Sequence, residues 1–286
     1  MYIYSGDTAP AQRFLGELSP AVASVPLTKV FATGVTAMHP FSAVCRIEVR
    51  TAKGNSSVGS GVLISGHHVL TCAHILYDRE DPNPRRVTVL PNHDGSDDKR
   101  QPIPANAWAV KPGWSWSECR TGGDDLAIIR LSRKADADFL PVQNFNPSAI
   151  GSGPITLAGY PAFSDTDKAY FMYRSQGPVL GGFGILCCAD AWPKKCKPPL
   201  PKQTDNVTRT DFSPINDKMK LIGHKLATEK CMSGGPMWII DNKKPVLVAL
   251  HEGVIDGGKH KRAVLLNSSV RTLINDWMTR QFRPLS

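Results

Sequence analysis

The sequence predicts an all-β fold of two small antiparallel barrels, followed by one helix near the carboxyl end. Three observations lead to this prediction. From about residue 41 the chain breaks into short runs of alternating or apolar residues, separated by turns rich in Gly, Asn, Asp and Pro. The same pattern returns after residue 155, so a second set of strands follows the first. A stretch near residue 270 instead carries apolar residues at helical spacing.

The first set of strands begins near Phe41. Residues 43–49 alternate with a period of two, as in a strand with one face buried. Residues 58–65 are apolar with interspersed glycines, and residues 87–90 form another short apolar run. We expect these runs to belong to a first barrel that spans residues 40–140.

The second set has the same texture. Residues 155–159 and 245–250 are short, almost entirely apolar runs bounded by turn residues. We expect them to belong to a second barrel over residues 141–267, joined to the first near residues 138–154. The Pro- and Lys-rich stretch from 187 to 220 is longer than a hairpin needs, which indicates a surface insertion.

A single helix is predicted over residues 268–282. Asn267 or Ser268 can cap its amino end, because both side chains accept hydrogen bonds from free backbone amides. Five apolar residues then follow at intervals of three and four, on one face: Val270, Leu273, Ile274, Trp277 and Met278. This face is expected to pack against a barrel.

Residues 1–39 show no sustained periodicity and contain several prolines. We interpret them as an irregular extension, either wrapped on the body of the protein or removable. The first residues lack the basic and apolar regions of a secretory signal peptide. On that ground the sequence favours a cytoplasmic location or export by another route.

Composition narrows the classes of partner. The 286 residues carry a formal charge of +9, but most basic residues are dispersed and no basic stripe is interleaved with aromatics. This argues against a nucleic-acid partner and favours attraction to acidic peptides. No run of about 18 apolar residues exists, so no membrane partner is expected. We expect a monomer that acts on protein or peptide.

The chain has seven cysteines, an odd number that cannot all pair within one molecule. Free thiols and a reducing compartment are the simpler interpretation, although one bridge within residues 187–196 stays open. The cysteine spacing lacks the CxxC pairs of structural zinc sites, and no nucleotide-binding fingerprint is present. We therefore expect no metal and no cofactor.

Three short motifs carry the chemistry of the chain. His74 ends the run Thr71-Cys72-Ala73-His74, Asp125 precedes an apolar strand, and Ser233 begins Ser-Gly-Gly-Pro. A serine hydroxyl becomes a good nucleophile when a histidine takes its proton and a carboxylate orients that histidine. The neighbouring Asp124 could compete for this role, but we interpret it as a turn residue.

These motifs and four others resemble the chymotrypsin-like serine peptidases, most closely their bacterial glutamyl endopeptidase branch. The resemblance covers roughly residues 40–280 and implies the chymotrypsin type of double barrel. It implies a serine endopeptidase in which Ser233 is the nucleophile, His74 the base and Asp125 the orienting acid. The other matching stretches are Gly59 to Ile64, Leu157 to Pro161, Ala249 to Gly253, and Ala263 to Asn267.

The chain departs from this family just before Ser233. The family has Gly-Asn or Gly-Asp there, and this chain has Cys231-Met232. The resemblance assigns the oxyanion hole to the amides of Cys231 and Ser233, where the loss of one donor typically costs 10²- to 10³-fold in rate. A catalytically weak or inactive peptide-binding pseudoprotease is therefore the alternative function. Cys231 as nucleophile is disfavoured, because it lies two residues too early.

The resemblance also implies an acid-binding pocket. Thr228 and His251 match positions that bind a glutamate side chain at P1 in the glutamyl branch, and a hydroxyl and an imidazole can both donate to a carboxylate. Lys225 and Lys230 favour the same ligand. Glu252 argues against it unless its side chain points outward. Residues 251–253, with Glu252 and Gly253, are expected to bind the substrate backbone as an added strand.

Overall fold

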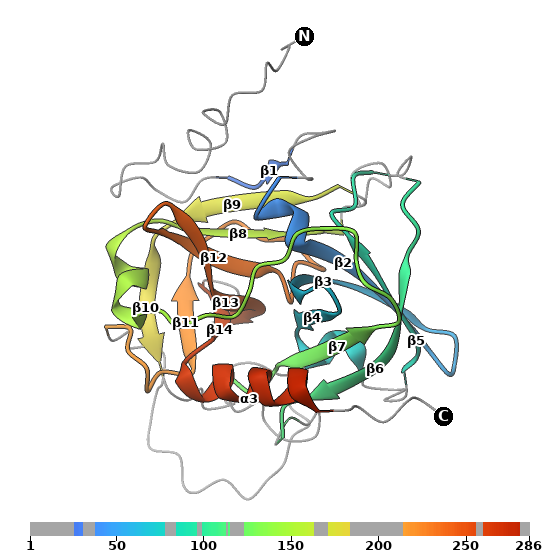
Figure 1. The fold of residues 1–286 in the computed structure, drawn as a ribbon. Helices are drawn as coiled ribbons and strands as arrows, with labels where there is room; N and C mark the ends of the chain where they lie inside the picture. The colour runs from blue at the N-terminus through green and yellow to red at the C-terminus, as the bar shows by residue number, and fades with distance from the viewer. Residues whose placement is uncertain are drawn as a thin grey trace, which may run out of the picture.

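The computed structural model consists of two antiparallel β-sheets that lie side by side, with few helices (Figure 1). It describes residues 26–30, 38–77, 84–95, 99–112, 114, 123–162, 171–183, 214–255 and 260–280. The predicted all-β fold of the chymotrypsin type is confirmed, since every extended element within these residues is an antiparallel strand.

The first sheet closes into a six-stranded barrel in the order β2-β3-β4-β7-β6-β5. Every β-strand predicted from the first set of apolar runs lies in it. Its strands are β2 (Val44–Thr51), β3 (Ser56–Ser65), β4 (His68–Thr71), β5 (Pro84–Pro91), β6 (Ile103–Val110) and β7 (Ala127–Leu131).

The second sheet has eight strands in the order β1-β9-β8-β12-β13-β14-β11-β10. No ladder among the described residues joins its two ends, so it forms a half-barrel rather than a closed one. Its strands are β1 (Thr28–Lys29), β8 (Ile155–Gly159), β9 (Tyr173–Gly177), β10 (Val179–Phe183), β11 (Leu221–His224), β12 (Pro236–Asp241), β13 (Lys244–Ile255) and β14 (His260–Leu265).

Part of the amino-terminal extension joins this second sheet. β1 is only two residues long and pairs with Tyr173 and Arg174 of β9. The interpretation of residues 1–39 as an extension otherwise lies outside the described residues. The same holds for most of the predicted insertion, for the bridge considered within residues 187–196, and for Cys119.

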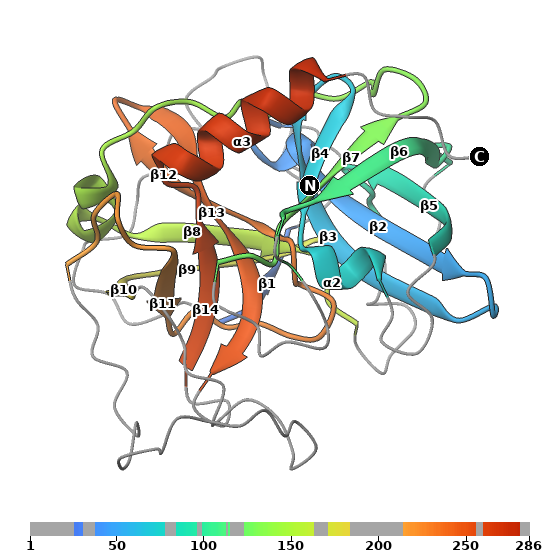
Figure 2. The same ribbon diagram turned by 90° about the horizontal axis from the view of Figure 1, so that it is seen from below.

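The predicted helix is α3 (Ser268–Thr279), and Asn267 is its cap. The Asn267 side chain accepts a hydrogen bond from the Val270 amide at 3.0 Å. Val270, Ile274 and Trp277 are buried in the larger hydrophobic cluster, which is built mainly from the first barrel. The helix thus reaches from the second sheet, which it follows in the chain, to the first barrel, as Figures 1 and 2 show.

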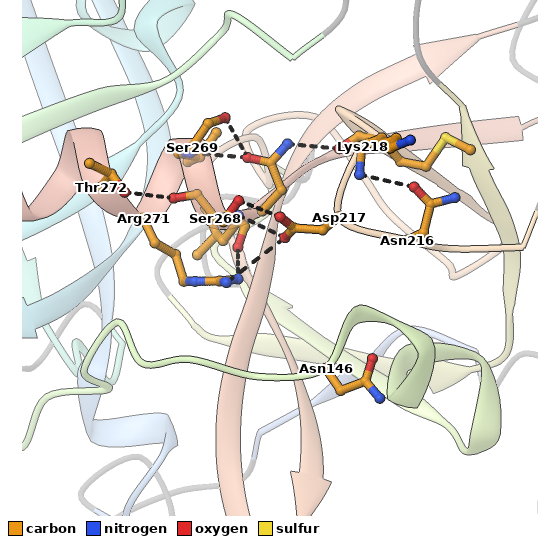
Figure 3. Close-up of polar contacts among 12 residues, drawn as sticks. Asn146, Asn216, Asp217, Lys218, Ser268, Ser269, Arg271 and Thr272 are labelled. Carbon is orange, nitrogen blue, oxygen red and sulfur yellow. Dashed lines mark hydrogen bonds and ion pairs between the residues drawn. The ribbon is translucent and has the colours of Figure 1, made fainter.

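A loop before β11 fixes the amino end of α3. Asp217 accepts hydrogen bonds from the amide and the hydroxyl of Ser268 and lies 3.8 Å from Arg271 (Figure 3). The hydrogen bond from the Ser268 hydroxyl lowers the pKa of Asp217 below its usual value. A carboxylate at this position also favours the helix dipole.

Two hydrophobic clusters form the interior. The larger one fills the first barrel and also includes Trp238 of β12, which packs edge-on against Phe41 with ring centroids 5.4 Å apart. The smaller one lies in the second sheet, around Leu157, Met232 and Val248. Trp238 therefore ties the second sheet to the first core. No helix within the described residues is both long enough and apolar enough to cross a membrane.

Three short helical segments complete the described elements. α2 (Ala73–Leu76) begins just after β4 and contains His74. η1 (Phe41–Ala43) leads into β2. η2 (Pro147–Ser152) lies in the connection between the two sheets, close to β10. Its amino end is capped by Asn146, whose side chain accepts from the Ser148 amide at 3.1 Å.

Candidate active site

His74 and Asp125 meet because their strands are paired. Thr71 at the end of β4 lies opposite Ala127 at the start of β7, so residues just beyond each strand end lie at the same edge of the barrel. Asp125 Oδ2 is 2.6 Å from His74 Nδ1, and Oδ1 accepts the His74 backbone amide at 2.9 Å. With Nδ1–H held by the carboxylate, Nε2 is left as a proton acceptor.

The two side chains differ in exposure in a way that suits this pairing. The Asp125 side chain is 1% exposed and the His74 side chain 19%. A buried carboxylate that receives two hydrogen bonds is strongly oriented, while the outer edge of the imidazole stays open to a reactant. Asp124 points elsewhere, since its carboxylate binds Lys111 Nζ at 2.6 Å. Of the two aspartates, Asp125 is therefore the one that contacts His74.

Ser233 lies in a tight turn, residues 231–235, called here the Ser233 turn. Its hydroxyl donates a hydrogen bond to the backbone carbonyl of Glu252 at 3.0 Å. The next amide, that of Gly234, donates to the His251 carbonyl at 2.7 Å. The turn is therefore bound to β13 on one side, and the Ser233 hydroxyl is directed at β13 rather than at His74.

Ser60 of β3 binds the Ser233 turn from the other side. Its amide donates to the Ser233 carbonyl at 2.9 Å, and its hydroxyl donates to the Cys231 carbonyl at 2.9 Å. The same hydroxyl accepts from the Tyr160 amide at 2.8 Å, and the Ser60 carbonyl accepts from the Thr71 hydroxyl at 2.7 Å. One fully buried serine thus connects the first barrel, the turn and the end of β8.

Gly234 is required by this arrangement. Its φ is +80°, and a β-carbon there would lie 2.1 Å from the Ser60 carbonyl oxygen and 2.4 Å from the Thr71 hydroxyl. Both the left-handed backbone and the lack of space therefore exclude a side chain. The glycine after Ser233 lets the turn approach β3 closely enough to be bound by Ser60.

Cys231 has a backbone conformation normally reserved for glycine. Its φ is +69°, in the left-handed region that costs about 1–2 kcal/mol for other residues. The chain thus accepts strain at this position instead of changing the course of the turn. Burial raises the pKa of the Cys231 thiol, although Arg46 and Lys230 oppose the shift. The thiol is therefore kept neutral.

His251 is fully buried beside the Ser233 turn, and its Nδ1 is 3.2 Å from Nε2 of His224 on β11. Burial, together with the nearby charges of His74 and Lys261, lowers the pKa of His251 to about 3. Burial also lowers the pKa of His224 well below its usual value, with contributions from His251 and Lys261. Both imidazoles are therefore neutral at pH 7, so the positive charge considered for His251 is absent here.

Glu252 does not face the same side as His251. Its carboxylate is buried and lies 2.5 Å from the guanidinium of Arg262 on β14. The two charges compensate each other, so Glu252 places no net negative charge beside the Ser233 turn. The Glu252 side chain does not point outward into solvent. Its negative charge is instead compensated by Arg262, so it is not expected to repel an acidic ligand.

The remaining expected binding residues lie around the end of β13. This strand continues beyond the point where β12 pairs with it, at Leu250, and no described strand pairs with Gly253 or Val254 on that side. A β-carbon on Gly253 would meet nothing within 4 Å. Thr228 is half-buried in the loop that leads from β11 to the Ser233 turn, and Val254 is exposed.

One group of possible metal ligands occurs among the described residues. Ligand atoms of Cys72, His74 and Asp125 lie within 4.8 Å of one another. Asp125 is bound to His74, and the Cys72 thiol donates to the His251 carbonyl at 3.3 Å. These residues are therefore engaged with the protein. Cys45, Cys72 and Cys231, the three cysteines that the structure describes, are not joined in disulfide bonds.

Sequence reasoning did not find Ser60, His224, Lys261 or Arg262. Ser60 stood inside a Gly-Ser-Gly motif that was noted only as part of a strand. A small polar residue between two glycines in an apolar strand was the available signal, since a buried hydroxyl needs partners. No motif assigns the other three to the site, because their neighbours come from separate strands.

Comparison with known proteins identifies the family and the fold of the chain. The family described as "Trypsin-like peptidase domain" matches residues 59–250. Among solved structures, a Glu endopeptidase in complex with MPD is similar at a TM-score of 0.63 and 15% identity, over 89% of this chain and 97% of the other. No curated protein sequence matches the chain significantly.

Two further solved structures have the same fold. The protease Anisep from Arthrobacter nicotinovorans is 14% identical at a TM-score of 0.57, over 84% of this chain and 97% of the other. A scabies mite inactivated protease paralogue is 17% identical at a TM-score of 0.57, over 84% and 95%. At these identities the structural likeness shows the fold alone.

Proposed function

The chain belongs to the trypsin-like peptidase family, and from this membership we propose that it is a serine endopeptidase acting through Ser233, His74 and Asp125. The observation that carries the proposal is the 2.6 Å contact between the buried Asp125 carboxylate and His74 Nδ1. This contact leaves Nε2 of a half-buried imidazole as the acceptor that a serine nucleophile requires. The substrate is a protein or peptide, and it binds between the proposed domains 40–140 and 141–267.

In the first step the Ser233 hydroxyl leaves the Glu252 carbonyl and turns toward His74. Its oxygen attacks the peptide carbonyl carbon while Nε2 of His74 takes the proton. The C–N bond then breaks, and the departing amine receives this proton. Water hydrolyses the resulting ester by the same route. Hydrogen bonds of this kind are often incomplete before substrate binds.

The oxyanion that forms in each step is assigned to the amides of Cys231 and Ser233. The left-handed φ of Cys231 supports this assignment, because the backbone keeps the course that a glycine would give it. Ser60 supports it as well, since its hydroxyl donates to the Cys231 carbonyl. This hydrogen bond fixes the peptide group between Cys231 and Met232. Preorganised donors of this type are typically worth 10²- to 10³-fold in rate each.

We propose a preference for glutamate at P1, as in the glutamyl endopeptidase branch. Thr228, His251, Glu252 and Gly253 are the proposed substrate-binding residues. Gly253 would pair with the substrate backbone along the open side of β13. Compensation of Glu252 by Arg262 supports an acidic ligand, since it leaves no net negative charge beside the Ser233 turn.

Covalent labelling tests the nucleophile directly. A fluorophosphonate probe is expected to label the protein, and the Ser233→Ala variant is expected to remain unlabelled. The variant Ser42→Ala is the control, because it removes a serine hydroxyl that is buried in η1, away from the Ser233 turn. Labelling that persists in Ser233→Ala, or its absence in the native protein, would overturn the proposed nucleophile.

One observation favours a second function, that of a peptide-binding pseudoprotease. The Ser233 hydroxyl is bonded to the Glu252 carbonyl, and Cys231 replaces the glycine of the family motif. The variant Cys231→Gly separates the two functions. If strain at Cys231 impairs the oxyanion hole, the variant gains peptidase activity by about 10²- to 10³-fold, the effect expected from one donor. An inactive native protein whose Cys231→Gly variant is also inactive supports the pseudoprotease.

A further inference from the structure

Three strands of the second sheet bring a lysine and two histidines to one face. His224 of β11 lies directly opposite Lys261 of β14, and His251 of β13 lies opposite Ala263 of the same strand. Lys261 and Ala263 are two residues apart, so their side chains lie on the same face. The 3.2 Å contact between the two imidazoles shows that the histidines share this face as well.

This face adjoins the Ser233 turn. The His251 amide donates to the Gly235 carbonyl at 2.9 Å, and the His251 carbonyl accepts from the Gly234 amide at 2.7 Å. A side chain that occupies the position before the scissile bond would therefore lie next to the residues of this face. The free side of β13 at Gly253 gives the peptide backbone its place.

The charges on this face do not cancel. His224 and His251 are buried and neutral, so neither contributes a positive charge at pH 7. Arg262 points to the opposite face, where it pairs with Glu252. Lys261 is half-buried and close enough to lower the pKa of both histidines, and no carboxylate among the described residues pairs with it.

An ammonium group that pairs with no carboxylate of the described residues, and that lies beside two neutral buried histidines, attracts a carboxylate more strongly than one in water does. A carboxylate bound there would also accept hydrogen bonds from the lysine, which are stronger than neutral ones. Because His224 and His251 are neutral, Lys261 is the only positive charge of these three residues. No free energy is therefore spent on burying several positive charges side by side.

We propose that Lys261 is the residue that recognises an acidic P1 side chain, with the His224–His251 pair forming the neutral wall behind it. This inference rests on the proposed function, because it assumes that a peptide binds along Gly253 with P1 beside Ser233. It extends that function by assigning the positive charge of the pocket to β14. Lys225 and Lys230, considered from the sequence, are exposed in the loop before the turn.

Binding to the Ser233→Ala protein tests this assignment without requiring catalysis. Two synthetic peptides are compared by calorimetry, identical except for Glu or Gln at P1. The Glu peptide is expected to bind about tenfold more tightly, the effect of one charged hydrogen bond. Lys261→Met should remove this difference while leaving the Gln peptide unchanged, and Lys261→Arg should retain it.

Lys225→Met is the matched control, since it removes an exposed lysine next to His224 and should leave the difference intact. The inference is overturned if the Glu peptide does not bind, if both peptides bind equally, or if Lys261→Met keeps the preference. Thermal unfolding of each variant checks that the fold is retained. Failure of the fluorophosphonate test would reject the proposed nucleophile but leave this result standing, because binding is measured in a protein without Ser233.

Discussion

The first barrel and the second sheet differ in how they close and in which side chains they place near the Ser233 turn. The first closes its ladder of six strands and presents His74 and Asp125 already in contact. The second leaves its eight-stranded sheet open and buries a histidine pair and an ion pair beside the Ser233 turn. In the first half a charged side chain orients His74, whereas in the second half the buried charge of Glu252 is compensated by Arg262.

The contact that most depends on the first barrel is tested by Asp125→Asn. An amide cannot hold His74 in the tautomer that leaves Nε2 free, and we expect kcat to fall by roughly 10⁴-fold with little change in stability. Asp124→Asn should leave kcat nearly unchanged, because Asp124 binds Lys111 instead of His74. Similar losses in both variants would contradict the pairing. Steady-state kinetics on a peptide substrate measures this.

Buried charge in the second sheet is tested by Arg262→Met. Removing one partner leaves the Glu252 carboxylate buried without its cation, which typically costs about 3–5 kcal/mol. In the first barrel Glu48→Gln removes a partner of Arg46 from a pair whose Glu48 side chain is 40% exposed, and about 0–1 kcal/mol is expected. Urea unfolding at pH 7 compares them. Equal costs would mean that the two halves do not differ in this respect.

The joint between the two halves is tested by Gly234→Ala. A β-carbon at Gly234 must displace Ser60 or the turn, and a shift of about 1 Å in Ser233 is expected to lower kcat/KM about 100-fold. Gly54→Ala is the matched control, since Gly54 also has a positive φ (+88°) but open space around it. It should cost about 1–2 kcal/mol of stability without loss of kcat/KM. An active Gly234→Ala protein would show that the turn is not held by β3.

The attachment of α3 to the second sheet gives the smallest effect. The lowered pKa of Asp217 means that its contribution to stability is present above the ordinary carboxyl value of 3.8 and is lost as pH falls through the lowered value. Asp217→Asn should cost less than about 1 kcal/mol at neutral pH, since the group is exposed. The difference in Tm between the two proteins should shrink in acid, and a difference independent of pH would exclude the charge as its cause.

Local sequence pattern predicted the elements themselves well. The alternation in residues 43–49 and the apolar run 155–159 correspond to β2 and β8, because a period of two with bounding turn residues leaves little alternative. Asn267 or Ser268 is predicted to cap α3 from neighbouring residues alone, and the structure shows that Asn267 is the cap. The closure of the second barrel depends on pairing between strands far apart in the chain, and there the structure differs from the prediction, because the second sheet is open within the described residues.

What the sequence determined by itself is the all-β class, several of the strands, the capped helix and the order of His74, Asp125 and Ser233 along the chain. Only the tertiary structure decided that His251 contacts His224 while Glu252 pairs with Arg262. It also placed Lys261 opposite His224 and bound Ser60 to the Ser233 turn. The sequence alone does not distinguish the surroundings of neighbouring buried residues such as His251 and Glu252. Their environments are set by strand register, which joins residues far apart in the chain, and so their pKa values and charges follow from the folded state alone.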